Sequence, residues 1–72
     1  MDVLEVLKSI KEDVDFENST DFIEDGLLDS FDLVNLVSEL EDVFDIEIRG
    51  VDIIPENFTS IETITELVEK YQ

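Results

Sequence analysis

Residues 26–44 read GLLDSFDLVNLVSELEDVF, and this stretch decides the fold. Its apolar residues recur at three- and four-residue spacing, the period of one face of an α-helix. They are Leu33, Leu36, Val37, Leu40, Val43 and Phe44. Asp29 is suited to cap the helix N-terminus, and Asp32, three residues on, supplies an acidic form of the capping box. The segment therefore predicts an amphipathic helix from about Ser30 to Phe44.

Two further helices and a short helical turn are predicted on either side. The apolar spacing in residues 2–13 matches one helical stripe, as does that in residues 61–71. Ser60, with Thr63 three residues on, is suited to open the last helix. Pro55 is well placed at the first position of a short helical turn through Phe58.

The connecting segments predict one long ordered loop and one ambiguous stretch. Residues 14–29 contain turn formers and Gly26, yet also many apolar residues, so several of these should fold back onto the core. The apolar residues of that loop are Phe16, Phe22, Ile23, Leu27 and Leu28. The alternation of Ile46 and Ile48 with charged residues would by itself permit a short strand. We expect an all-α fold in one domain, residues 1–72, with three main helices and one short helix.

The composition excludes several functional classes. Leu, Ile, Val and Phe supply 29 of the 72 residues, well above the roughly 20% below which disorder is expected. A net charge of −17 disfavours nucleic acid, membranes and self-association, so we expect a monomer whose partners carry basic patches. The absence of His and Cys removes the usual zinc ligands and the neutral-pH general base. We therefore expect neither an enzyme nor a metal centre, and no leader segment opens the chain, which favours a cytoplasmic protein.

Ser30 is the candidate functional residue because it lies where a glycine-containing loop segment meets a predicted helix N-terminus. Unpaired backbone N–H groups and the helix dipole stabilise a phosphate at such a position, even on an acidic molecule. The simpler interpretation is that Ser30 is only a capping or first-turn residue, since serine is common there.

The motif Asp29-Ser30-Phe31 resembles the attachment site of the acyl and peptidyl carrier protein family. The similarity extends over about residues 23–70. It rests on the runs LVSELEDVF (36–44), DIEI (45–48) and PENFTSI (55–61). The resemblance implies a small acyl-carrier-like bundle and a 4′-phosphopantetheine arm, donated by coenzyme A and attached covalently to Ser30. It also implies a discrete, non-catalytic carrier of acyl or aminoacyl thioesters.

The same resemblance implies the partners. A phosphopantetheinyl transferase would load the arm, an acyl-loading or adenylating ligase would charge it, and acyltransferases or synthases would use the cargo. Two residues depart from fatty acid carriers, which usually have leucine at the position of Phe31 and glutamate at that of Asn35. The run GLLDSF (26–31) is closer to D-alanyl carriers and some stand-alone peptidyl-type carriers.

A helical projection at about 100° per residue places Phe31, Asn35, Glu39 and Asp42 on the face opposite the apolar stripe. Phe31 would then be an exposed aromatic anchor beside the attachment serine, within an acidic surface that steers partners. Alternatively, Phe31 folds back against its apolar neighbours, and the acidic residues form only a solvated face.

Two other functions are considered. Oxygen-bearing residues between Asp13 and Glu24 fall at positions 1, 3, 5, 7, 9 and 12 of a calcium-binding loop of the EF-hand type. However, Asn18 replaces the glycine at position 6, and Gly26 interrupts the helix that should follow. The other alternative is an acidic protein-binding domain that needs no modified serine. Such a binder would tolerate Ser30→Ala, whereas a carrier would not.

Overall fold

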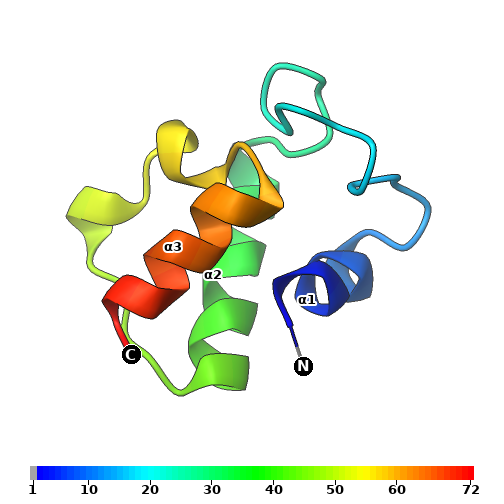
Figure 1. Ribbon diagram of the computed structural model, residues 1–72. Helices are drawn as coiled ribbons and strands as arrows, with labels where there is room; N and C mark the ends of the chain where they lie inside the picture. The colour runs from blue at the N-terminus through cyan, green and yellow to red at the C-terminus, as the bar shows by residue number, and fades with distance from the viewer. Residues whose placement is uncertain (1) are drawn as a thin grey trace.

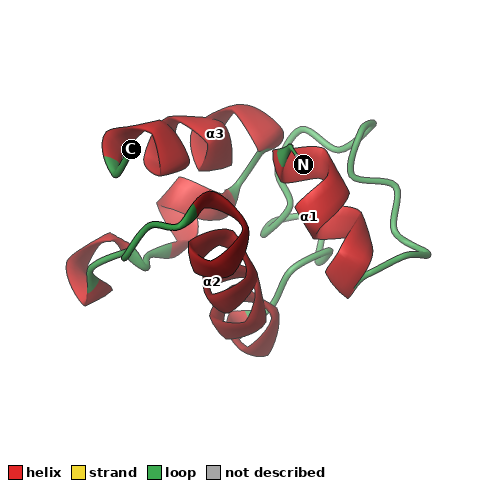
Figure 2. Cartoon of the chain, turned by 90° about the horizontal axis from the view of Figure 1, so that it is seen from below, coloured by secondary structure: helices red, strands yellow, loops and turns green. Residues whose placement is uncertain are grey.

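The computed structural model describes residues 2–72, which form three α-helices and two short 3-10 helices. Their bounds are α1 Val3–Ile10, α2 Ser30–Phe44, η1 Gly50–Asp52, η2 Pro55–Phe58 and α3 Ile61–Lys70. Helix α1 packs against both α2 and α3, and η2 lies against the start of α3 (Figure 1). Residues 2–72 contain no strand (Figure 2). The predicted all-α bundle of three main helices with a short helical turn is confirmed.

Helix α2 has the predicted bounds. Asp29 caps it through a capping box with Asp32, and its buried residues are the predicted apolar ones Leu33, Leu36, Val37 and Leu40. The helix ends after Phe44 because Asp45 adopts a left-handed backbone, with φ 54° and ψ 52°. Helix α3 also begins as predicted, since the Ser60 side chain accepts a hydrogen bond from the Thr63 N–H.

Helix α1 is shorter than the predicted span of residues 2–13. It ends at Ile10 because Lys11 leaves the helical region, with φ −143° and ψ 88°. The Lys11 ammonium instead donates a hydrogen bond to the Leu27 carbonyl at 3.0 Å. The chain thus leaves the helix where the Lys11 side chain contacts a residue 16 positions away, a contact that helical periodicity could not indicate.

The strand considered at Ile46 and Ile48 does not form. The Ile46 N–H bonds to the Glu41 carbonyl at 3.1 Å, and the Ile48 N–H bonds to the Glu41 carboxylate at 2.9 Å. Both donors are therefore used by the last turns of α2, and Ile48 is buried against the core.

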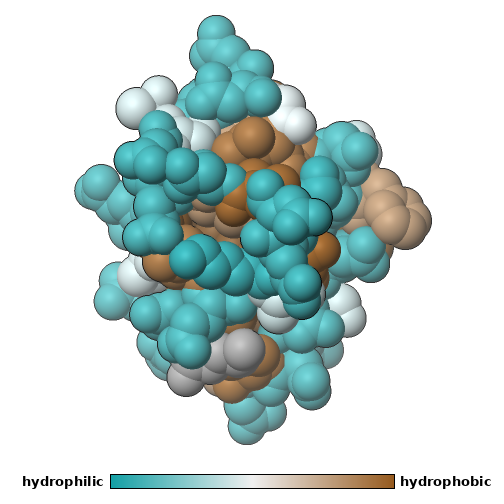
Figure 3. Space-filling view, turned by 90° about the vertical axis from the view of Figure 1, so that its right-hand side faces the viewer, coloured by the Kyte–Doolittle hydropathy of each residue, from teal (hydrophilic) through white to brown (hydrophobic). Residues whose placement is uncertain are grey.

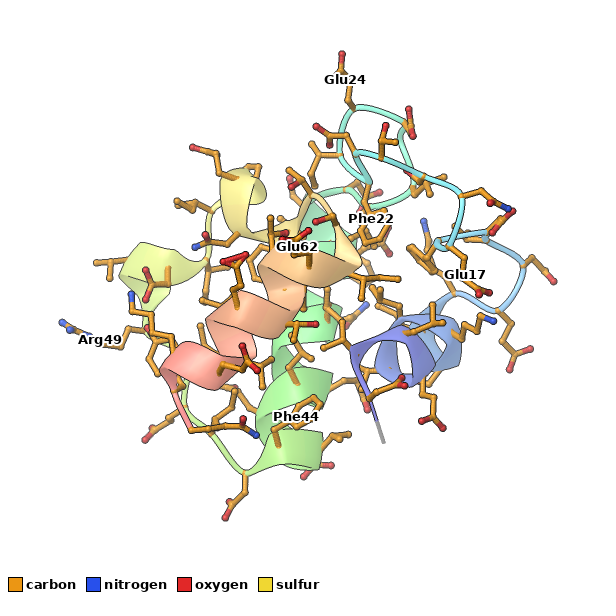
Figure 4. All side chains as sticks on the ribbon, in the orientation of Figure 1. Glu17, Phe22, Glu24, Phe44, Arg49 and Glu62 are labelled. Carbon is orange, nitrogen blue, oxygen red and sulfur yellow. The ribbon has the colours of Figure 1, made fainter. Side chains whose placement is uncertain are left out.

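The long loop folds back onto the bundle, as predicted. Phe16 and Phe22 are each 1% exposed, and their rings meet edge to face with centroids 5.1 Å apart. The Phe22 N–H donates to the Thr59 carbonyl at 2.7 Å, while the Phe22 carbonyl accepts from Leu27 and Leu28. In Figure 4 Phe22 points inward and Glu24 points away from the molecule. The loop is thus anchored at its middle residue.

The end of α3 is joined to η1 through one carboxylate. Asp52 accepts hydrogen bonds from the Tyr71 hydroxyl and, at 2.9 Å, from the Lys70 ammonium. These two donors lower the pKa of the Asp52 carboxyl below its ordinary value of 3.8. The Tyr71 hydroxyl also accepts from the Arg49 N–H at 3.3 Å, so the segment after α2 is held against α3.

Candidate functional site

The N-terminus of α2 is capped by Asp29 and not by Ser30. The Asp29 carboxylate accepts from the Asp32 N–H at 2.9 Å, and the Asp32 carboxylate accepts from the Asp29 N–H at 3.2 Å. The Leu33 N–H is bonded to the Asp29 carbonyl at 3.0 Å. The predicted acidic capping box is therefore confirmed, and the cap role that was considered for Ser30 is filled by its neighbour.

Ser30 is the first residue of α2 and is exposed. No side-chain hydrogen bond within residues 2–72 uses its hydroxyl, which leaves the oxygen available to a reagent. Since Asp29 satisfies the N–H groups of Asp32 and Leu33, those of Ser30 and Phe31 are the first-turn donors left over. An accessible hydroxyl beside two such donors at a helix N-terminus fits a phosphate ester.

Buried residues on both sides hold this corner in place. Leu28, before the motif, is 2% exposed, and Leu33, after it, is 7% exposed. Gly26 takes a positive φ of 74°, which lets the loop turn into the helix at a position where a side chain would be strained. The three residues Asp29, Ser30 and Phe31 thus form an exposed corner between two apolar anchors.

Lys11 lies beside the same corner. Its ammonium is 2.8 Å from the Asp32 carboxylate and bonds to the Leu27 carbonyl. The hydrogen bond from Lys11 is the main cause of a lowered pKa at Asp32, below the ordinary 3.8, against the opposing effect of partial burial. Asp32 is therefore an anion throughout the neutral range. The sequence offered no signal for this contact, because the two residues are 21 positions apart.

The outward face of α2 carries the predicted surface residues. Phe31 is 73% exposed, so its side chain does not fold back against its neighbours. Asn35, Glu39 and Asp42 are exposed too. Val34 is 66% exposed next to them and was missed. The i, i+3 spacing of Phe31 and Val34 could have indicated a small apolar patch, since such residues are neighbours on a helix.

The remainder of the visible surface is mainly polar. Figure 3 shows the right-hand side of the view in Figure 1, where hydrophilic residues dominate and apolar side chains show only in patches between them. This pattern fits the net charge of −17. Over the part of the chain that the structure describes, no helix has the length and apolar character needed to cross a membrane.

The loop considered for calcium does not assemble a site. No group of three or more acidic residues in residues 2–72 converges as metal ligands would. Glu17 lies beside α1 and bonds to Lys8 at 3.0 Å, whereas Glu24 points away at the loop tip (Figure 4). Ser19 bonds to Asp25, outside the candidate loop, at 2.6 Å. Phe16 and Phe22 in this segment are buried in the core, and the acidic residues around them do not converge.

Comparison with models of known protein families gives a match. The family model described as "Phosphopantetheine attachment site" matches residues 2–69. No curated protein and no solved structure matches the chain. The family match covers most of the chain, and the exposed corner at the start of α2 lies within it.

Proposed function

This chain belongs to the phosphopantetheine-attachment family, and we propose that Ser30 is the residue to which its arm is attached. Members of the family hold their cargo as thioesters on a covalently attached 4′-phosphopantetheine, whose terminal thiol supplies the reactive group. They are carriers and do not catalyse the reactions of the cargo. The absence of cysteine from this chain is compatible with that role, because the arm brings the thiol.

The observation that carries the proposal is the division of roles between Asp29 and Ser30. Asp29 caps the helix, so the Ser30 hydroxyl is exposed and needed for no local structure. A serine whose only role was to cap α2 would have its oxygen bonded to a first-turn N–H. The helix N-terminus also offers positive potential to an incoming phosphate, within a molecule that otherwise repels anions.

Attachment is a phosphoryl transfer from coenzyme A. The Ser30 oxygen forms a bond to the phosphorus that carries pantetheine, and the pyrophosphate P–O bond to that phosphorus breaks. Adenosine 3′,5′-bisphosphate leaves with the bonding electron pair, and the hydroxyl proton passes to a base of the transferase. The contribution of this chain is to present the oxygen on a rigid corner and to offer the Ser30 and Phe31 N–H groups to the phosphodiester.

The docking surface that we propose is the outward face of α2, made of Phe31, Val34, Asn35, Glu39 and Asp42. The acidic residues would steer partners that carry basic patches, and the two apolar side chains would be buried on contact. The partners that fit are the phosphopantetheinyl transferase, a loading ligase of the adenylating type, and acyltransferases or synthases. We propose acyl or aminoacyl groups as cargo, in keeping with the resemblance of residues 26–31 to D-alanyl and peptidyl-type carriers.

We also propose that residues 1–72 act as one carrier domain and that this domain is monomeric. One cluster of buried residues, drawn from all three α-helices and the long loop, supports a single domain. The strong negative charge opposes association between copies.

The test is intact mass after incubation with coenzyme A and a broad-specificity phosphopantetheinyl transferase. Three proteins are compared, namely the parent, Ser30→Ala and Ser38→Ala. Ser38 is an exposed serine on the same helix and is the matched control. We expect one added phosphopantetheine in the parent and in Ser38→Ala, and none in Ser30→Ala. Addition to Ser30→Ala, or none to a folded parent while a known carrier is modified, would overturn the assignment.

A further inference from the structure

Lys11 bridges the two sides of the proposed attachment site. Its ammonium bonds to the Leu27 carbonyl at 3.0 Å, three residues before Ser30, and to the Asp32 carboxylate at 2.8 Å, two residues after it. Lys11 itself is the C-terminal cap of α1. One side chain thus joins the end of α1, the approach loop and the first turn of α2.

This contact is more sheltered than the other ion pairs of residues 2–72. The side chains of Lys11 and Asp32 are 32% and 14% exposed, against 49% and 57% for Lys8 and Glu17. Exposed ion pairs are screened and lose order easily, whereas a half-buried pair with a second hydrogen bond keeps its geometry better. Lys11 is therefore suited to fix the position of neighbouring backbone.

Lys11 also offsets negative charge near the Ser30 hydroxyl. Asp29 and Asp32 place two carboxylates in the first turn, beside the hydroxyl that would receive an anionic phosphate. The helix N-terminus offsets only part of that negative charge. Lys11 supplies a full positive charge at Asp32. The electrostatic potential at the helix N-terminus is therefore less negative and repels the phosphate less.

We propose that Lys11 is a positioning residue for the attachment of phosphopantetheine to Ser30. It holds the corner formed by Leu27 and the first turn of α2, and it neutralises Asp32 beside the incoming phosphate. This inference rests on the proposed role of Ser30. It concerns how the chain prepares that serine, and no part of it depends on the identity of the cargo.

Removal of Lys11 has two electrostatic effects on the rate of modification by the transferase, and they act in opposite directions. Any Lys→Met substitution makes the net charge one unit more negative, which strengthens long-range attraction to a basic transferase and would raise the rate. The proposed role of Lys11 at the attachment site predicts instead that the rate of modification falls. Lys8→Met is the matched control, because Lys8 also forms an ion pair, with Glu17, and this pair makes no side-chain hydrogen bond to residues 27–33.

The experiment measures kcat and KM of a phosphopantetheinyl transferase, with coenzyme A saturating and the carrier as the varied substrate. We expect Lys11→Met to lower kcat/KM about threefold to fivefold, the rate equivalent of losing one ion pair, mainly through kcat. Lys8→Met should equal or exceed the parent, and Lys11→Arg should recover most of the loss, since Arg can donate to both oxygens. Circular dichroism at the assay temperature confirms that each variant is folded.

A second readout separates the positioning from the charge effect. The double variant Lys11→Met/Asp32→Asn removes both charges, so it should recover part of the rate that Lys11→Met alone loses. Amide hydrogen exchange at Asp32 and Leu33, measured without transferase, should be faster in Lys11→Met and unchanged in Lys8→Met. A parental rate for Lys11→Met, or an equal loss in Lys8→Met, would overturn the inference while leaving Ser30 modified. Failure of the parent to be modified would instead count against the proposed function.

Discussion

Replacement of Phe22 by Ala should destabilise the protein strongly, because this residue anchors the loop that leads to Ser30. Its side chain is 1% exposed and packs edge to face on Phe16. Its backbone bonds to Thr59 on one side and to Leu27 and Leu28 on the other. The matched control is Phe31→Ala, the same chemical change at a side chain that is 73% exposed.

The size of the effect follows from burial. A buried Phe→Ala substitution costs about 3–5 kcal/mol of unfolding free energy, through lost transfer energy and the cavity left behind. A domain of 72 residues has roughly 4–11 kcal/mol in total, at about 0.05–0.15 kcal/mol per residue. Phe22→Ala should therefore remove about a quarter or more of the stability and lower Tm by more than about 12 °C. Phe31→Ala should stay within about 0.5 kcal/mol of the parent.

Urea unfolding followed by circular dichroism measures both variants, and the transferase assay supplies the functional readout. Phe31→Ala should weaken partner recognition without loss of stability, whereas Phe22→Ala should lose stability first. A cost below about 1 kcal/mol for Phe22→Ala, or equal costs for the two variants, would refute the docked loop, since a buried aromatic residue cannot be removed so cheaply. The comparison also separates the structural aromatic residue from the proposed docking residue.

Two further predictions concern Asp29 and Asp52. Asp29→Ala should cost about 1 kcal/mol in urea unfolding through loss of the helix cap, and Asp29→Asn should recover most of it; equal losses for both variants would argue against the cap. Tyr71 and Lys70 lower the pKa of Asp52 in the folded protein below 3.8, so its contribution to stability is complete above that value and is lost as the pH falls through the folded pKa. The difference in unfolding free energy between the parent and Asp52→Asn should thus be present at pH 7 and shrink below about pH 4; a difference independent of pH would show that the charge of Asp52 is not involved.

Local sequence signals identified much of the candidate site. The Asp29-Ser30-Phe31 motif and its capping box were predictable, because each depends on residues within one helical turn, whereas the helical projection left the exposure of Phe31 open. The contacts of Lys11 with Leu27 and Asp32 were not predictable, because they join residues 16 and 21 positions apart in the sequence. The candidate calcium loop matched a spacing of ligand positions in the sequence, but the acidic residues of residues 2–72 form no group that could hold a metal ion.

The same division holds for the fold. The apolar period and the capping residues determined α2, η2 and α3 from the sequence, because helices form through contacts three and four residues apart. Only the tertiary structure decided that the Lys11 side chain bonds to Leu27 and Asp32 and that Ile48 is buried against the core. Those outcomes depend on hydrogen bonds and burial between segments distant in sequence. Such contacts exist only after the chain has folded, so no local pattern encodes them.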